Sequence, residues 1–355
     1  MSATPSDRFY RRNILKWTAA VPLSAAFGGS RLANAETQSG VRGQEGKKVT
    51  LKLGSSQPTH TENAHTVFFD KFVSELTKNS NGDVGAIFYG DSQLGPEDKY
   101  PSQLNFGTLD MMLAVSDWSP IVPELGVLTM GFLFNSLQQV GKVLDGSAGQ
   151  QLQTIFKSKT KAEILGWCFN FGGRNVLSKV PILTAAEFHG KKIRVLPSPT
   201  FVQTFRLLGA DPVPMSFGEV YVSLQTGVID GLEHDPPTML QYKFYEVAKN
   251  LTVTQHIFDP LAPVISDSTL KKLSSTDQQA VRKAAAEAIS YQRPKAAEAA
   301  QNALDQLKQK GVKVMEIDRL KLVDMVKPLW TSFTDQHADT KPVLQAILAV
   351  TGQSI

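Results

Sequence analysis

The chain has 355 residues, of which 42% are hydrophobic and 20% are charged, and its formal net charge is +4 at pH 7. This composition is typical of a globular chain, and the length is sufficient for two domains. No long basic run of the kind that binds nucleic acid or an anionic membrane is present, and a single cysteine, Cys168, excludes an internal disulfide.

The first 35 residues predict an export signal. Arg11 and Arg12 precede a moderately apolar segment, residues 17–32, and Ala33-Asn34-Ala35 then offers small residues to a signal peptidase. This pattern is typical of a twin-arginine signal for the periplasm, whereas Pro22 and the shortness of the segment argue against a membrane anchor. The signal holds five of the 37 basic and one of the 33 acidic residues, which leaves 32 of each and a net charge of zero.

From Val49 onward, short apolar strands alternate with helical patterns, which is typical of an α/β fold with largely parallel sheets. In the first half we expect strands at 49–56, 83–90, 109–116 and 162–172, with helices that begin at 64, span about 96–106 and lie within 136–158. After Gly172-Gly173 the alternation restarts, with strands at 193–197, from 228 and at 251–256, helices at 200–208 and 217–225, and a candidate return strand at 261–268.

These repeats predict two α/β lobes. We expect the first lobe to comprise residues 47–171 and 259–290, and the second to comprise residues 172–258 and 311–355. Residues 276–310 are rich in Ala, Glu, Lys and Gln and predict a helix of roughly 50 Å, which Pro294 should kink. A helix of that length is expected to brace both lobes.

Two arginines are the leading site candidates, because strand ends that face a cleft are where α/β proteins bind ligands. Arg194 lies between the β-branched residues Ile193 and Val195, so it is expected at the buried end of a strand, where its permanent charge needs a fixed partner. The partner is either an internal carboxylate or a carboxylate of a ligand. Arg174 falls at a comparable end of a neighbouring segment, and two guanidinium groups could grip one carboxylate.

The loops that follow other strands supply further candidates. Gln57 follows the first strand, Asp117 and Trp118 follow the third, and Phe171 precedes the lobe crossing. Trp118 and Phe171 are candidate apolar walls, although aromatic residues in such positions also serve as plain core.

Glu233, His234 and Asp235 stand in a row and form another candidate wall. Three consecutive residues are weak evidence for a metal site, since side chains alternate faces along a strand. Their carboxylates could instead pair with Arg194 and make the arrangement purely structural.

The sequence does not indicate an enzyme. It contains no nucleophile elbow, phosphate loop, dinucleotide fingerprint or HExxH zinc motif, and its histidines are scattered without a nucleophile at a matching spacing. We therefore expect a binding protein without a cofactor, with an exported enzyme or ligand sensor as the alternative.

The mature chain resembles the extracytoplasmic solute-binding proteins of tripartite ATP-independent periplasmic (TRAP) transporters, of the dicarboxylate-binding type. The resemblance rests on KKIRVLPSP, LGADPVPMSFGEVYVSLQTGVIDGLE, YKFYEVAKNLTVTQH and the SQLG of residues 92–95. It implies a periplasmic-binding-protein-like fold of two α/β lobes around a ligand cleft with a long hinge-spanning helix. It also implies a monomer that delivers a small organic acid to a TRAP permease.

The resemblance assigns site residues too. In that family the arginine of the I-R-V strand forms a salt bridge with the ligand carboxylate, which here is Arg194, and the arginine of GGRNV, Arg174, matches a second contact. Many members carry asparagine and proline where this chain has His234 and Asp235. Others carry Glu-Trp, with the glutamate helping to hold a metal, which leaves Glu233 a minor candidate for that role. Sugar acids, dicarboxylates, and aromatic or keto acids all remain open as ligands.

Overall fold

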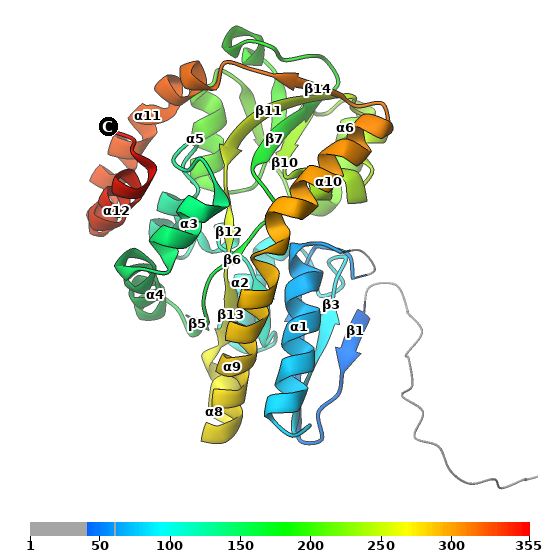
Figure 1. Ribbon diagram of the computed structural model, residues 1–355, viewed down its shortest axis with the longest axis vertical. Coiled ribbons are helices and arrows are strands. Elements are labelled where there is room, and N and C mark those ends of the chain that lie inside the picture. Colours follow the sequence, from blue (N-terminus) through cyan, green and yellow to red (C-terminus); the bar gives the residue numbers. More distant parts are fainter. Residues whose placement is uncertain (1–40, 60–61) are drawn as a thin grey trace, which may run out of the picture. The chain divides into compact units, whose positions relative to one another are not determined.

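The computed structural model describes residues 41–59 and 62–355. Two six-stranded sheets organise this part of the chain (Figure 1). The first sheet has the order β1-β3-β2-β4-β13-β5, with β1 Val41–Gln44, β2 Val49–Gly54, β3 Val84–Tyr89, β4 Met111–Leu113, β5 Ala162–Ile164 and β13 Pro263–Ser266. The predicted twin-arginine signal lies outside the described residues.

The second sheet has the order β14-β11-β7-β10-β8-β9, and its strands are β7 Arg174–Ser178, β8 Lys192–Val195, β9 Asp211–Pro214, β10 Gly231–His234, β11 Asn250–Ile257 and β14 Lys313–Glu316. A short ribbon pairs β6 (Cys168–Phe169) with β12 (Pro260–Leu261). Both large sheets are mixed rather than largely parallel. For example, β8 runs parallel to β10, whereas β7 runs antiparallel to it.

The helices follow the strands as the α/β prediction required. They are α1 Ala64–Asn79, α2 Tyr100–Phe106, α3 Leu137–Leu144, α4 Ser147–Lys159, α5 Pro199–Leu207, α6 Val220–Thr226, α7 Pro236–Gln241, α8 Asp267–Lys272, α9 Ser275–Gln292, α10 Lys295–Gln309, α11 Arg319–Gln336 and α12 Lys341–Thr351. Three short 3₁₀ turns near the site are η1 Glu97–Lys99, η2 Ser116–Trp118 and η3 Pro123–Leu128. Within residues 41–59 and 62–355, no helix has both the length and the apolar composition to span a bilayer.

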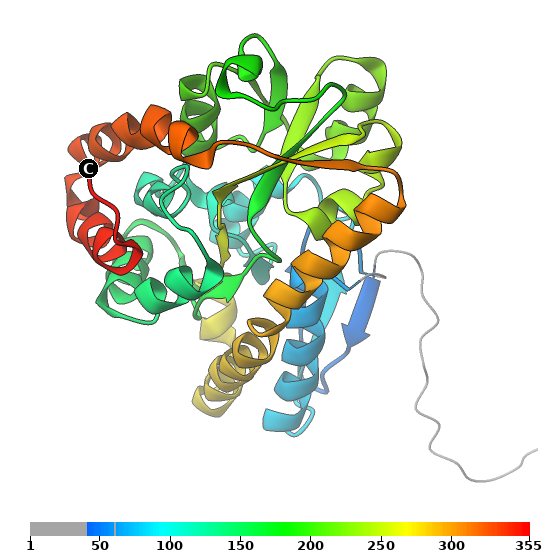
Figure 2. The same ribbon diagram turned by 45° about the horizontal axis from the view of Figure 1, so that its top comes forward.

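The segment 276–310 forms two consecutive helices, α9 and α10, which are separated at Arg293 and Pro294. Pro294 lacks a backbone N–H, so the break falls where the sequence predicts a kink. Figure 1 shows α9 beside α1, against which it packs, while α10 packs on α7. At the C-terminal end, α11 packs on α5, and α12 packs on α3 and α4 (Figure 2).

The central strands of the second sheet position the site. Every residue of β7 and of β10 is buried, so both faces of this part of the sheet are covered. Arg174 is the first residue of β7 and His234 is the last residue of the antiparallel β10, so both lie at the same edge of the sheet. Gly172, with a φ of +107°, turns the chain into this edge in a conformation that favours glycine.

Candidate functional site

Arg194 lies on β8 and its side chain is completely buried. Its Nε and Nη2 donate hydrogen bonds to the carbonyl oxygen of Met215 at 3.1 and 2.9 Å, and its guanidinium lies 5.7 Å from the centre of the Phe217 ring. Its Nη1 has no hydrogen-bond partner in the described part of the chain. Burial lowers the pKa of Arg194, against the opposing effect of Glu233 and Glu97, because the charged form is poorly solvated there.

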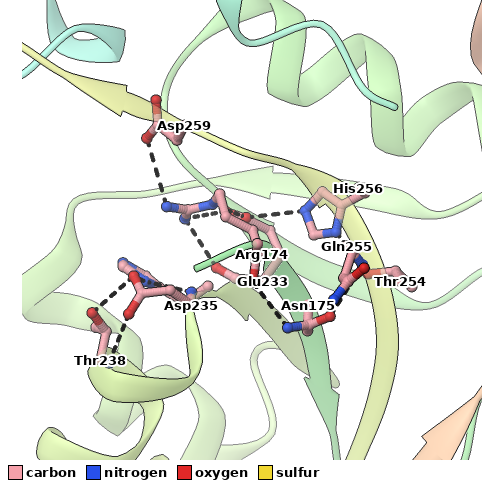
Figure 3. A network of polar contacts seen from close by, with 11 residues as sticks. Arg174, Asn175, Glu233, Asp235, Thr238, Thr254, Gln255, His256 and Asp259 are labelled. Atoms are coloured by element: carbon pink, nitrogen blue, oxygen red, sulfur yellow. Dashed lines mark hydrogen bonds and ion pairs between the residues drawn. The ribbon is translucent and has the colours of Figure 1, made fainter. Parts of the chain in front are cut away.

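Arg174 is equally buried but is neutralised within the protein. Its Nε and Nη2 donate to the two carboxylate oxygens of Glu233 at 2.5 and 2.9 Å, a two-pronged ion pair (Figure 3). The Nη1 atom lies 3.8 Å from Oδ2 of Asp259. Burial alone would raise the pKa of Glu233, but Arg174 and the hydrogen bond from His256 lower it to about 2.

Strand register explains this pairing. Glu233 lies opposite Val176, so its side chain shares a face of the sheet with Arg174, two residues earlier on β7. Leu232 lies opposite Arg194 on β8. Since neighbouring residues alternate faces along a strand, Arg194 projects from the face of the sheet opposite to that of Glu233. Glu233, which the sequence left open as a structural partner of Arg194, therefore forms no ion pair with it.

His234 and Asp235 form a local unit at the end of β10. The His234 Nδ1 atom lies 2.7 Å from Oδ2 of Asp235. Asp235 is also the N-cap of α7, and it accepts hydrogen bonds from the backbone N–H and the hydroxyl of Thr238 at 2.9 and 3.0 Å. The side chain of Asp235 is thus occupied by the helix cap and His234, and it forms no ion pair with Arg194.

A cavity of about 50 Å³ lies between the strand ends of the second sheet and the loops of the first sheet. Four of the nine predicted site residues line it, namely Gln57, Asp117, Arg174 and His234. Its other lining residues are Ser56, His65, Glu97, Leu113, Ala114, Ser116, Asn170, Leu196, Phe217, Asp259 and Leu261. Asp259 and Glu97 were missed in the sequence. Asp259 interrupts the apolar stretch HIFDPLAPV, and that is the signal that would have found it.

The other predicted residues lie around this cavity rather than on its wall. Arg194 projects from β8, Glu233 holds Arg174, and Asp235 holds His234. Trp118 and Phe171 belong to the hydrophobic core, where Trp118 packs edge-on against Phe156 at 4.7 Å. The sequence left two alternatives open for these aromatic residues, apolar walls of the site or plain core. Their position matches the second alternative.

Metal binding finds no support in the described residues. Within 41–59 and 62–355, no group of three or more His, Cys, Asp or Glu side chains is arranged to hold an ion. The carboxylate of Glu233 is engaged by Arg174 and lies 3.2 Å from Nε2 of His256.

Three buried polar atoms without a hydrogen-bond partner are found on side chains in and beside this cavity. They are Nη1 of Arg194, Oε1 of Gln57 and Oδ1 of Asp259. Native proteins pair nearly all such buried atoms. Of the nine unpaired atoms in the described residues, these three lie on or beside residues that line a single cavity, which indicates a ligand site there. One atom is a cationic donor and two are acceptors, which sets the chemistry of the molecule that would satisfy them.

A larger cavity of about 400 Å³ lies between η3, α5 and α11. Its walls carry hydroxyl, amide and apolar side chains and one imidazole, that of His337, but no Arg, Lys, Asp or Glu. It therefore has no fixed charge to match a carboxylate, and we do not assign the site there.

Comparisons with known proteins identify the family of the chain. The sequence profile of the "Bacterial extracellular solute-binding protein, family 7" matches residues 54–336. The chain is 33% identical over 297 residues to the 2,3-diketo-L-gulonate-binding periplasmic protein YiaO of Escherichia coli, covering 82% of this chain and 89% of that protein.

Solved structures give the same result. A TRAP periplasmic solute-binding protein of Chromohalobacter salexigens with bound D-glucuronate matches with a TM-score of 0.80 and 27% identity, over 84% of this chain and 99% of that one. One of Roseobacter denitrificans with bound L-galactonate matches with a TM-score of 0.79 and 29% identity, over 86% and 100%. The α/β, periplasmic-binding-protein-like fold and the expectation of a binding protein rather than an enzyme are thereby confirmed. The chain belongs to the family 7 bacterial extracellular solute-binding proteins, the periplasmic receptors of TRAP transporters.

Proposed function

We propose that this receptor captures a sugar acid, a carboxylic acid that carries several hydroxyl groups, and delivers it to a TRAP membrane permease. The observation that carries the proposal is Arg194, a completely buried guanidinium that forms no ion pair with a described carboxylate and whose Nη1 is unpaired. A buried charge without a partner is costly, and a solute carboxylate would supply that partner through charge-assisted hydrogen bonds.

The class of acid is inferred from the relatives. The proteins compared above bind 2,3-diketo-L-gulonate, D-glucuronate or L-galactonate, which all combine one carboxylate with several oxygen substituents. The cavity of this chain offers matching acceptors in Gln57 and Asp259 beside the arginines. Aromatic acids fit this lining less well, because Phe217 is the only aromatic ring besides the histidines in it.

The remaining site residues take supporting roles in this proposal. Arg174 contacts the solute through its Nη1 edge, since Glu233 occupies the rest of the guanidinium. His234, fixed by Asp235, and Asp117 complete the hydrogen-bonding wall. Trp118 and Phe171 support the wall from the core.

Entry of the solute requires the cavity to open. A volume of about 50 Å³ is well below the roughly 300–1,000 Å³ of typical ligand pockets. We infer that the two predicted lobes, residues 47–171 with 259–290 and residues 172–258 with 311–355, separate to admit the solute and close around it. The ligand would favour the closed form because only there does it contact both sides.

Export and assembly complete the proposal. The Arg11-Arg12 pair and the following apolar segment favour the twin-arginine route to the periplasm. A monomer suffices, because the proposed site is built from one chain.

The test is a binding screen on the mature chain, residues 36–355, after removal of any co-purified ligand. Thermal melts with a panel of uronates, aldonates, C4-dicarboxylates and aromatic acids should show an upward shift for sugar acids, and calorimetry should give one site per chain. Mass spectrometry of the ligand that co-purifies should identify a sugar acid. Stabilisation by C4-dicarboxylates or aromatic acids alone would refute the proposed class.

A further inference from the structure

Asp259 lies between β11 and β12, is 3% exposed and lines the cavity. Its Oδ2 faces Arg174, whereas its Oδ1 has no hydrogen-bond partner in the described residues (Figure 3). Leaving a buried carboxylate oxygen unpaired costs free energy that a plain structural role does not repay. The side chain therefore presents an acceptor to whatever occupies the cavity.

The charged side chains near the cavity come from several segments. Arg174 on β7 lines the cavity, and Arg194 on β8 lies beside the lining residue Phe217. Glu97 in η1 and Asp117 in η2 come from the loops of the first sheet, whereas Asp259 lies next to Arg174. A solute carboxylate fits the arginines, and a hydroxyl group, which donates hydrogen bonds, fits the unpaired carboxylate oxygen of Asp259.

Glu97 and Asp259 lie close enough to Asp117 for their charges to act on it. Burial, followed by the neighbouring Glu97 and Asp259, raises the pKa of Asp117 well above its ordinary value. Burial likewise raises the pKa of Asp259 to about 7, although Arg174 and the nearby Asn170 side chain oppose the shift. A further negative charge placed beside this group would be repelled or would force a proton onto one of the acids.

We propose that Asp259 is a specificity-determining residue that accepts a hydrogen bond from a hydroxyl group of the bound acid and rejects acids that carry a second carboxylate at that end. The inference rests on the proposed binding of a sugar acid and goes further, because it restricts the solute to hydroxylated monocarboxylates. Specificity of this kind combines an attractive contact for the correct ligand with a repulsive one for its competitor.

The test uses matched pairs of probes that differ at one end. An aldonate such as L-galactonate carries a terminal CH₂OH group, whereas the corresponding aldarate, galactarate, carries a second carboxylate at the same carbon. A second open-chain pair is D-gluconate and D-glucarate. Calorimetric titration of the wild-type chain at pH 8, where an acid with a pKa of about 7 is mostly ionised, should favour the monocarboxylate of the better-bound pair by about tenfold or more, because the second carboxylate is then placed against a like charge.

Two substitutions separate the contributions of Asp259. Asp259→Asn keeps the size and an acceptor oxygen but removes the acid, so it should retain the monocarboxylate and reduce its preference over the dicarboxylate by about tenfold. Asp259→Leu removes the acceptor as well, so the affinity for the monocarboxylate should fall by about tenfold or more. Asp211→Asn, at an exposed acid on β9, is the matched charge control and should change neither affinity.

The outcomes distinguish failure of the proposed function from failure of the role of Asp259 alone. If the wild-type chain binds none of the four probes, nor any other sugar acid, the proposed function fails and the role of Asp259 fails with it. If the chain binds dicarboxylates as tightly as monocarboxylates, or if Asp259→Asn leaves their ratio unchanged, only the role of Asp259 is overturned. Asp117→Asn, at the neighbouring acid, provides the same comparison if Asp259 variants do not fold.

Discussion

Tyr242 and Ser56 are joined by a hydrogen bond of 2.7 Å, in which the Tyr242 hydroxyl donates to the Ser56 carbonyl oxygen. Tyr242 follows α7 beside the second sheet, and Ser56 follows β2 of the first sheet. A second hydrogen bond, from the Ser216 hydroxyl to the Asp98 carboxylate at 3.3 Å, also joins a loop of the second sheet to a loop of the first. These contacts tie the two sides of the cavity together, so they are expected to break whenever the solute enters or leaves.

Tyr242→Phe should therefore speed the release of the solute without removing a ligand contact. Loss of one neutral hydrogen bond corresponds to a dissociation rate about 2- to 12-fold higher, with a smaller change in the association rate. Stopped-flow measurement of both rates checks this. Tyr221→Phe is the control, because its hydroxyl bonds to Glu246 on the same side of the cavity. Equal effects of the two variants would contradict a role in closing.

Arg194 should be essential for binding and largely dispensable for the apo fold. Arg194→Ala is expected to weaken binding by about 30-fold to several thousand-fold, since truncating one member of a buried charge pair costs roughly 2–5 kcal/mol. Arg194→Lys keeps the charge but loses the planar guanidinium, so it should also bind weakly.

The comparison for Arg194 is Arg174→Ala, which strands the buried carboxylate of Glu233. Melts of the apo proteins should show a much larger loss of stability for Arg174→Ala than for Arg194→Ala. An Arg194→Ala protein that melts early yet binds nearly as well as wild type would show that Arg194 is structural.

Glu233→Gln should destabilise the protein because it leaves the Arg174 guanidinium buried without its anion. Breaking a buried ion pair in this way lowers the free energy of unfolding by about 3–5 kcal/mol. The pKa of Glu233 is about 2 in the folded protein against an ordinary value of 4.5, so the stability it contributes is present above about pH 4.5 and is lost as the pH falls toward 2. Denaturant melts at pH 7 and pH 3 should show the difference between wild type and variant shrinking at the lower pH.

Asp259→Asn should stabilise the apo protein at alkaline pH. The pKa of Asp259 is raised to about 7 from 3.8, so the folded state holds this proton more tightly than the unfolded chain, and the benefit is full below about pH 3.8 and lost as the pH rises through 7. Asparagine does not titrate, so the melting temperature of the variant relative to wild type should increase between pH 4 and pH 8. A constant difference across this range would show that Asp259 is not buried as a protonated acid.

Much of the fold was predictable, because the spacing of apolar residues along the sequence indicates directly whether a segment forms a helix or a strand. The strands β2, β3, β8 and β11 and the helices α1 and α5 lie where the pattern predicts them, and Pro294 interrupts the long helical segment. The strand predicted at 162–172 instead forms β5 and β6, with Gly166 at a φ of +150° between them. The strand β7 was not predicted, because RNVLS is short and carries polar residues although it is buried on both faces.

The sequence by itself placed Arg194 in a strand, because the flanking β-branched residues Ile193 and Val195 favour extended backbone. The tertiary structure decided that the strand is covered on both faces, so that Arg194 is buried with its neighbours. Only the tertiary structure decided which partners the buried charges have. It places Glu233, 59 residues from Arg174, on the same face of the sheet, and it brings Asp259 to the cavity from a different segment. The physical reason is that a period of two residues fixes the face on which a side chain lies, whereas the partner on that face depends on strand order and register, which arise from contacts between distant segments.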